Sequence, residues 1–299
     1  MSLFPPHLQK GDTIAIVAPA KAIEKHLIEK AVSFFEEQGF RVIVGENCLK
    51  QHHYFSGTIL ERLSDFQHAL DDPSVKAIIC ARGGYGCVQL VDRIQWASQL
   101  REPKWIVGFS DVTVFHQRSL LMGIPAIHGS MPLNFEDNTT LALRTLVKAL
   151  NGTNYSIKAN HDPSNKLGIA TGKLVGGNLS ILYSLLGTDD QISYSGTILF
   201  IEDLSEQIYH LDRIFHAFEK AGVLDRIKGL IVGGMTDLKD TAVPFGMSYE
   251  EVILSHFEYR RIPIGFGFPA GHIADNQALI LGKDVMLTIE KSGSTLKYL

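Results

Sequence analysis

The first half of the chain alternates short apolar runs with longer segments in which apolar and polar positions recur at helical spacing. The apolar runs are nearly continuous, which is typical of strands that are covered on both faces of a sheet. Strands are predicted in this half at residues 13–18, 41–44, 75–80, 105–109 and 125–128.

The segments between these runs have the features of helices. Residues 22–38 keep their apolar side chains to one stripe, and Gly39 supplies a C-terminal stop. Thr58 and Glu61 have the spacing of a capping box, which satisfies backbone donors at a helix start. Repetition of strand, helix and strand predicts right-handed crossovers and a doubly wound, mostly parallel sheet. Ligands bind such sheets beyond the carboxyl ends of the strands.

The pattern changes after about residue 136, where a helical stretch at 140–150 gives way to polar, turn-rich sequence. We predict an amino-terminal doubly wound α/β domain over 1–150, a linker over 151–166, and a smaller mixed, β-rich α/β domain over 167–299. In the second domain, strands are predicted at 197–201, 229–232, 277–281 and 285–289, and helices at 179–186 and 208–221.

Composition and charge exclude several classes of protein. The 299 residues are 45% hydrophobic and 20% charged, a balance typical of a globular chain that needs no metal or disulfide to fold. The net charge of -4 gives no basic field for nucleic acid or an anionic membrane surface. Cys48, Cys80 and Cys87 are odd in number and lack C-x-x-C spacing, and the first residues show no export signal. These features predict a cytoplasmic location.

Ser110 follows one of the predicted strands at a sharp turn. The strand runs through Gly108 and Phe109 into Ser110, and a helical pattern begins directly afterwards. A serine at such a turn projects above the sheet edge, next to the free N–H groups of a helix N-terminus, which suits a nucleophile. The alternative is that Ser110 caps the helix, because serine is a preferred N-cap residue and the G-x-S-x-G elbow is not matched.

A glycine-rich segment follows another strand. Gly83, Gly84 and Gly86 let the backbone approach a ligand closely, and their N–H groups could complete an oxyanion hole. The same pattern is equally typical of a tight turn that requires positive φ.

Two loops of the second domain carry the remaining candidates. Glu202 and Asp203 end the apolar run at 197–201, where carboxylates could simply favour the N-terminus of the next helix. His272 lies in a loop rich in Gly, Pro and Asn, where a lone histidine is more often solvent-facing than catalytic. No H-E-x-x-H or comparable histidine spacing occurs, so the sequence predicts no metal site.

Ser110, Glu202 and His272 together supply a nucleophile, an orienting carboxylate and a general base, each at the end of a strand. Their order along the chain is one of the recurring triad orders. The residues therefore favour a metal-independent acyl-transfer enzyme without a cofactor. The alternative from another class is a non-catalytic peptide- or nucleotide-binding protein in which Ser110 only caps a helix.

The chain resembles the LD-carboxypeptidase family of serine peptidases, which includes muramoyl-tetrapeptide carboxypeptidases and microcin C self-immunity proteins. Segments in the family's order carry the resemblance, at residues 11–19, 81–86, 107–113, 172–179, 200–203 and 267–272. The resemblance implies that Ser110 is the nucleophile, His272 the general base and Glu202 its orienting carboxylate. It also implies an oxyanion hole from the backbone N–H groups of Gly84 and Asp111, and a site shared by the two domains.

The resemblance further implies a substrate. This is a murein tetrapeptide that loses its terminal D-alanine during cell-wall recycling, in a homodimeric enzyme; the third peptide residue, diaminopimelate or lysine, stays open. Arg82 is a candidate for binding the free carboxylate, although it could equally pair with a nearby acid. A microcin immunity-type peptidase that cleaves aminoacyl-nucleotide amides is the alternative within the family. Such a site commonly uses tryptophan in an extra loop, whereas Trp96 and Trp105, the only tryptophans, lie in regular segments.

Overall fold

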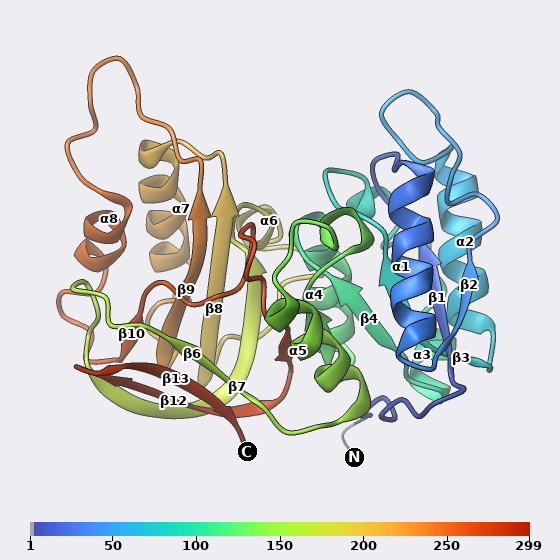
Figure 1. Cartoon of the computed structure of the whole chain (residues 1–299). Helices are drawn as coiled ribbons and strands as arrows, with labels where there is room; N and C mark the ends of the chain where they lie inside the picture. The colour runs from blue at the N-terminus through green and yellow to red at the C-terminus, as the bar shows by residue number, and fades with distance from the viewer. Residues whose placement is uncertain (1–2) are drawn as a thin grey trace. The chain divides into compact units, whose positions relative to one another are not determined.

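The computed structural model describes residues 3–299, which fall into two compact units (Figure 1). The first unit contains the chain up to Asn154 together with Ala274–Leu281. The second contains Tyr155–Ile273 and Gly282–Leu299. A short segment from late in the sequence therefore belongs to the first unit.

The first unit is built on a sheet with the strand order β11-β5-β4-β3-β1-β2. Neighbouring strands from β2 to β5 run parallel, and β11 is antiparallel to β5. The strands are β1 (Thr13–Val17), β2 (Arg41–Val44), β3 (Val75–Cys80), β4 (Trp105–Gly108), β5 (Ala126–His128) and β11 (Leu279–Leu281). The predicted doubly wound, mostly parallel sheet is confirmed.

Two of these strands differ from the prediction. β11 was expected in the second domain, but it pairs with β5 through Leu279 and His128. Its three buried apolar residues carry no signal for which sheet they join. β2 is largely exposed, although we expected all five strands to be covered, because it lies at the edge of the sheet.

Helices pack on the sheet in two groups. They are α1 (Lys25–Glu37), α2 (Ile59–Asp71), α3 (Ala97–Arg101), α4 (Thr113–Leu121) and α5 (Thr140–Asn151), with short 3-10 turns η1 (Cys87–Gln89), η2 (Ser110–Val112) and η3 (Pro132–Asn134). The predicted capping box of Thr58 and Glu61 is formed at the start of α2. Phe66 of α2 contacts Phe115 of α4, whereas Phe34 of α1 contacts Phe135 after η3. Right-handed crossovers on either side of β1 account for this division.

The second unit contains a mixed sheet with the order β10-β9-β8-β7-β12-β13-β6. β7, β8, β9 and β10 run parallel, and the others are antiparallel to their neighbours. The strands are β6 (Ser156–Ala159), β7 (Gly168–Asn178), β8 (Thr197–Leu204), β9 (Gly229–Thr236), β10 (Ile264–Gly265), β12 (Asp284–Glu290) and β13 (Gly293–Tyr298). The helices are α6 (Leu179–Ser184), α7 (Ile208–Lys220) and α8 (Tyr249–Ser255), of which α7 and α8 lie side by side (Figure 1).

Four strands of this sheet, β6, β7, β10 and β13, were absent from the prediction. β6 lies in the stretch expected to be a linker, and it buries Ile157 against the sheet where it pairs with β13. β7 carries glycines that weaken a strand pattern, yet a Cβ at Gly176 would lie only 1.8 Å from the carbonyl oxygen of Phe200. Glycine is therefore required there for β7 to approach β8.

Within residues 3–299, no helix is both long enough and apolar enough to cross a membrane. Cys48, Cys80 and Cys87 are buried free thiols, which agrees with the predicted absence of a disulfide framework.

Candidate active site

Ser110 lies directly after β4, where the chain turns into η2. Its φ of 62° places it in the left-handed region, which costs a residue with a side chain about 1–2 kcal/mol. The N-cap residues of η2 and α4 are Phe109 and Val112, so Ser110 is the N-cap of neither. Among the described residues, no side chain makes a cap hydrogen bond at the N-terminus of η2 or α4. The capping alternative is therefore wrong. Strained backbone at the carboxyl end of a strand is what a projecting nucleophile requires.

The glycine loop after β3 lies against this turn. A Cβ at Gly83 would lie 3.0 Å from Ser110 Cβ and 3.3 Å from the backbone nitrogen of Asp111. Gly84 has a φ of 109°, and a Cβ there would lie 2.7 Å from the Tyr54 hydroxyl. The interpretation as a tight turn therefore applies, because Gly84 and Gly86 have positive φ, and the loop also packs closely against Ser110. An oxyanion hole from the N–H groups of Gly84 and Asp111 stays a prediction.

Buried charges hold the loops after β1, β3 and β4 in place. The Asp111 carboxylate accepts a 2.9 Å hydrogen bond from the Cys87 N–H, and burial raises the pKa of that carboxyl. Arg62 donates to the carbonyl oxygens of Pro19 at 2.7 Å and Gly86 at 3.3 Å. The sequence analysis missed Arg62. The sequence feature that could have indicated it is a charged residue on the buried face of α2, one turn before Phe66.

Glu202 and His272 form a close pair in the second unit. Glu202 lies at the carboxyl-terminal part of β8 with a side chain that is 0% exposed, and its Oε2 is 2.6 Å from Nδ1 of His272. Asp203 instead accepts hydrogen bonds from the backbone and hydroxyl of Ser180 in the first turn of α6. The first turn of α7 contains no acid. The alternative in which these carboxylates serve the next helix is therefore wrong.

The surroundings of His272 set its protonation. Burial disfavours the imidazolium and lowers the pKa, but the hydrogen bond and charge of Glu202, together with the charge of Asp203, outweigh it. The net pKa of His272 lies above its ordinary value. When neutral, the ring donates Nδ1–H to Glu202 and keeps Nε2 as the proton acceptor, which is the tautomer a general base needs.

Comparison with known proteins identifies the family. Residues 14–129 match the LD-carboxypeptidase N-terminal domain, and residues 171–287 match the C-terminal domain. The murein tetrapeptide carboxypeptidase of Pseudomonas aeruginosa is 30% identical over 286 residues, covering 92% of each chain. The chain belongs to the LD-carboxypeptidase family of serine peptidases.

Further relatives agree with this membership. The microcin C7 self-immunity protein of Escherichia coli is 26% identical to this LD-carboxypeptidase family member, covering 97% of this chain and 94% of the relative. The crystal structure of muramoyltetrapeptide carboxypeptidase from Oxalobacter formigenes has a TM-score of 0.88 and 27% identity, covering 96% of this chain and 98% of that one. The predicted resemblance and the serine carboxypeptidase class are confirmed.

Arg82 of this family member lies between the glycine loop and the start of the chain's first helix. It donates from Nη1 to the carbonyl oxygen of Ala22 at 2.9 Å, and burial lowers the pKa of its guanidinium. Its Nε is buried and has no hydrogen-bond partner among the residues that the structure describes. The guanidinium thus has donor capacity left for an anion.

Gly271 precedes His272 in the same loop and lies against the side chain of Glu202. It has a φ of 109°, and a Cβ there would lie 2.7 Å from Glu202 Cβ and 2.8 Å from its Oε2. We expect Gly271→Ala to destabilise the protein by about 2–4 kcal/mol, since backbone strain and overpacking add. Urea unfolding measures the change.

Gly267→Ala is the matched control for this substitution. Gly267 also has positive φ, 67°, but a Cβ there would meet nothing within 4 Å. It should therefore cost only the backbone strain, about 1–2 kcal/mol. Equal losses in the two variants would contradict the close approach to Glu202.

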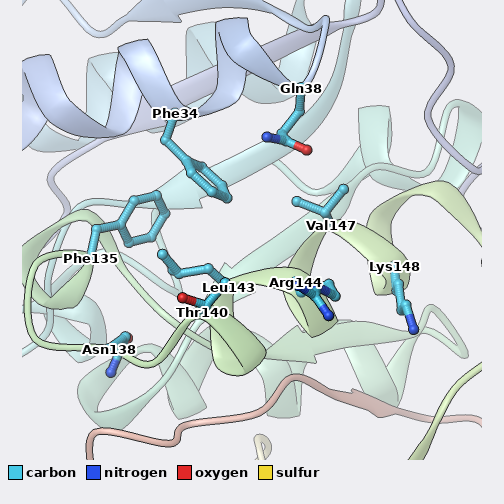
Figure 2. Close-up of a pocket in the computed structure, with 9 residues that line it drawn as sticks. All are labelled: Phe34, Gln38, Phe135, Asn138, Thr140, Leu143, Arg144, Val147 and Lys148. Carbon is cyan, nitrogen blue, oxygen red and sulfur yellow. The ribbon is translucent and has the colours of Figure 1, made fainter.

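A separate pocket of about 420 Å³ lies in the first unit between α1 and α5 (Figure 2). Phe34, Phe135, Leu143 and Val147 give it an apolar surface, with polar and charged side chains around them. None of the predicted site residues lines it. We assign it no part in the chemistry of this family member.

Proposed function

We propose that the protein is a serine-type L,D-carboxypeptidase that releases the terminal D-alanine of murein tetrapeptides, with Ser110, His272 and Glu202 as its triad. The observation that carries this proposal is the 2.6 Å contact between the buried Glu202 and His272, in a member of a serine peptidase family. The strained turn at Ser110 supports it. The P. aeruginosa relative, which is named for a murein tetrapeptide, supports the substrate.

In the proposed mechanism, Ser110 Oγ attacks the carbonyl carbon of the bond to D-alanine while His272 Nε2 takes the hydroxyl proton. Glu202 stabilises the imidazolium that forms. The N–H groups of Gly84 and Asp111 would receive the oxyanion. His272 then gives its proton to the departing amine of D-alanine. A water molecule, deprotonated by His272, hydrolyses the acyl-enzyme, and the proton returns to Ser110.

Arg82 is our candidate for the substrate's terminal carboxylate. A carboxypeptidase must recognise a free carboxylate, and a guanidinium matches that group with two parallel donors. The unpaired Nε and the position of Arg82 beside the glycine loop support this role.

The microcin immunity-type activity is less well supported. An aminoacyl-nucleotide amide calls for an exposed aromatic surface, commonly tryptophan. Trp96 and Trp105 have only 9% and 0% of their surface exposed. Neither is available for stacking on a base.

One assay tests the proposed function. Purified protein is incubated under EDTA with a murein tetrapeptide, its C-terminal amide, and an aminoacyl-sulfamoyl adenosine, and the products are identified by mass. We expect release of D-alanine from the free acid, little reaction with the amide, and greater loss for Arg82→Ala on the acid than on the amide. Peptides with diaminopimelate or lysine at the third position then define the preference.

Two outcomes of this assay would contradict the proposal. Cleavage of the nucleotide analogue in preference to the tetrapeptide would favour the microcin-type activity. Loss of tetrapeptide hydrolysis under EDTA, in protein that thermal unfolding shows to be folded, would contradict a metal-independent mechanism. A homodimer also stays a proposal, supported by the family resemblance, and a cytoplasmic location stays one that is supported by the cysteine pattern of the sequence.

A further inference from the structure

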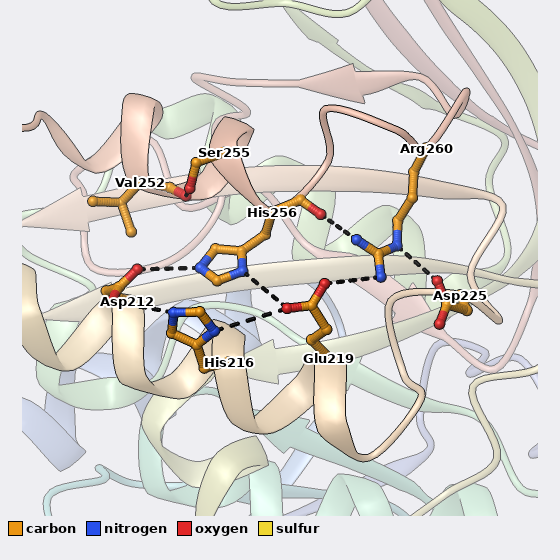
Figure 3. Close-up of polar contacts among 8 residues, drawn as sticks. All are labelled: Asp212, His216, Glu219, Asp225, Val252, Ser255, His256 and Arg260. Carbon is orange, nitrogen blue, oxygen red and sulfur yellow. Dashed lines mark hydrogen bonds and ion pairs between the residues drawn. The ribbon is translucent and has the colours of Figure 1, made fainter.

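A cluster of histidines and carboxylates in the second unit has no part in the proposed triad (Figure 3). Asp212 and His216 lie one turn apart on α7 and therefore share a face of that helix. His256 is the C-cap of α8 and is only 4% exposed. One ligand atom from each of these three residues lies within 4.8 Å of the others.

The spacing of the ligand atoms fits a metal ion. His256 Nε2 is 3.2 Å from Asp212 Oδ1, and His216 Nε2 is 3.6 Å from Asp212 Oδ2. Zinc binds nitrogen and oxygen at about 2.0–2.1 Å, so neighbouring ligand atoms of a tetrahedral site are about 3.3–3.4 Å apart. Each observed distance lies within a few tenths of an ångström of that value, but the two run to different oxygens of Asp212, so the carboxylate must rotate to offer one oxygen to the ion. Small rotations of the side chains would close the site.

The far nitrogens of both histidines face a second carboxylate. Glu219 Oε2 is 3.8 Å from Nδ1 of His216 and 3.8 Å from Nδ1 of His256. At 3.8 Å these are ion-pair contacts and not hydrogen bonds. A small shift of Glu219 would let it accept the Nδ1–H of a metal-binding histidine and so fix the tautomer that leaves Nε2 for the metal. Arg260 holds Glu219 through a 3.1 Å contact and is itself held by Asp225 at 2.8 Å (Figure 3).

We propose that Asp212, His216 and His256 bind one divalent transition-metal ion, with Zn²⁺ as the best match and a fourth position open to water. Two imidazoles and a carboxylate are a donor set for zinc and its neighbours rather than for Mg²⁺ or Ca²⁺. The ion also offsets negative charge: Arg260 pairs with Glu219 and Asp225, whereas the carboxylate of Asp212 lies against His216 and His256. It ties α7 to the end of α8.

This inference departs from the sequence analysis, which predicted no metal site. That prediction relied on histidine spacing within one segment. Here the spacing is Asp-x-x-x-His on one helix, and the second histidine comes from the end of another. Packing of α7 against α8 brings them together, and no local pattern records it.

The test uses the full chain after removal of bound metal. Zn²⁺ titrated by calorimetry should bind one ion per chain, and Co²⁺ should give the visible absorption of a four-coordinate site. At a free Zn²⁺ concentration of about 100 times Kd, the Tm should rise by roughly 5 °C or more. His216→Ala should remove both signals. Glu219→Gln should weaken binding by about 10- to 100-fold.

Two features keep this test decisive. His216 is 57% exposed, so its substitution should leave the fold intact even if the buried His256 cannot be replaced. His210→Ala is the matched control, because His210 lies on the same helix and contacts Glu206 one turn earlier, yet belongs to no such group among the described residues. Zn²⁺ binding equal in the parent and His216→Ala, or lost equally in His210→Ala, would overturn the proposal.

Discussion

Ser110→Ala is expected to lose hydrolysis of murein tetrapeptide by roughly 10⁴-fold or more while the protein stays folded. The proposed reaction depends on an oxygen nucleophile after β4, and alanine supplies none. Alanine must adopt the same left-handed backbone conformation as serine at this position, so the substitution adds little backbone strain. Release of D-alanine, followed by mass spectrometry, measures the activity, and thermal unfolding checks the fold.

Ser205→Ala is the control that matches Ser110→Ala in backbone conformation. Ser205 also has positive φ, 61° against 62° for Ser110, and it is exposed. It should keep the parent rate, because it has no proposed role in the reaction. Hydrolysis by Ser110→Ala at the parent rate would exclude the triad and favour a binding protein. A serine-directed phosphonate should add mass at Ser110 in the parent only.

Much of the first unit could be predicted because its signals are local. The apolar runs at β1, β3 and β4 are buried on both faces, and the capping box at Thr58 depends on residues only three positions apart. The edge position of β2 and the return of β11 could not be predicted, since both depend on which strands become neighbours. Burial at an edge is a property of the sheet and not of the strand's own residues.

The candidate site shows the same limit. A serine after β4 and an acid in the carboxyl-terminal part of β8 were visible as residues at strand ends, and the structure confirms those places. The residues that these side chains contact could not be predicted from sequence spacing alone. Asp203 precedes a helix in sequence but bonds to the start of α6, which lies earlier in the chain. Arg62 was missed because its bonds run to carbonyl oxygens of two distant loops.

Glu202→Gln is expected to lower kcat by roughly 10⁴-fold, as loss of the orienting carboxylate does in serine peptidases. Glutamine is nearly isosteric, but its amide does not carry the charge that stabilises the imidazolium. It can also present N–H₂ to the ring and so favour the wrong tautomer. The side chain of Glu202 is 0% exposed, so solvent does not take over the stabilisation of the imidazolium when the charge is lost. Steady-state kinetics on the tetrapeptide measure this loss.

The pH dependence separates this role from a structural one. Only neutral His272 can accept the serine proton, so kcat/KM should rise with pH through the pKa of His272, which Glu202 holds above its ordinary value. Removing the charge lowers that pKa, so the acidic limb of Glu202→Gln should move to lower pH. Asp203→Asn is the matched control: it removes a neighbouring charge but leaves the 2.6 Å hydrogen bond, so its shift should be smaller. If the acidic limb of the kcat/KM profile is at the same pH in Glu202→Gln as in the parent, the carboxylate does not set the pKa of His272 during catalysis.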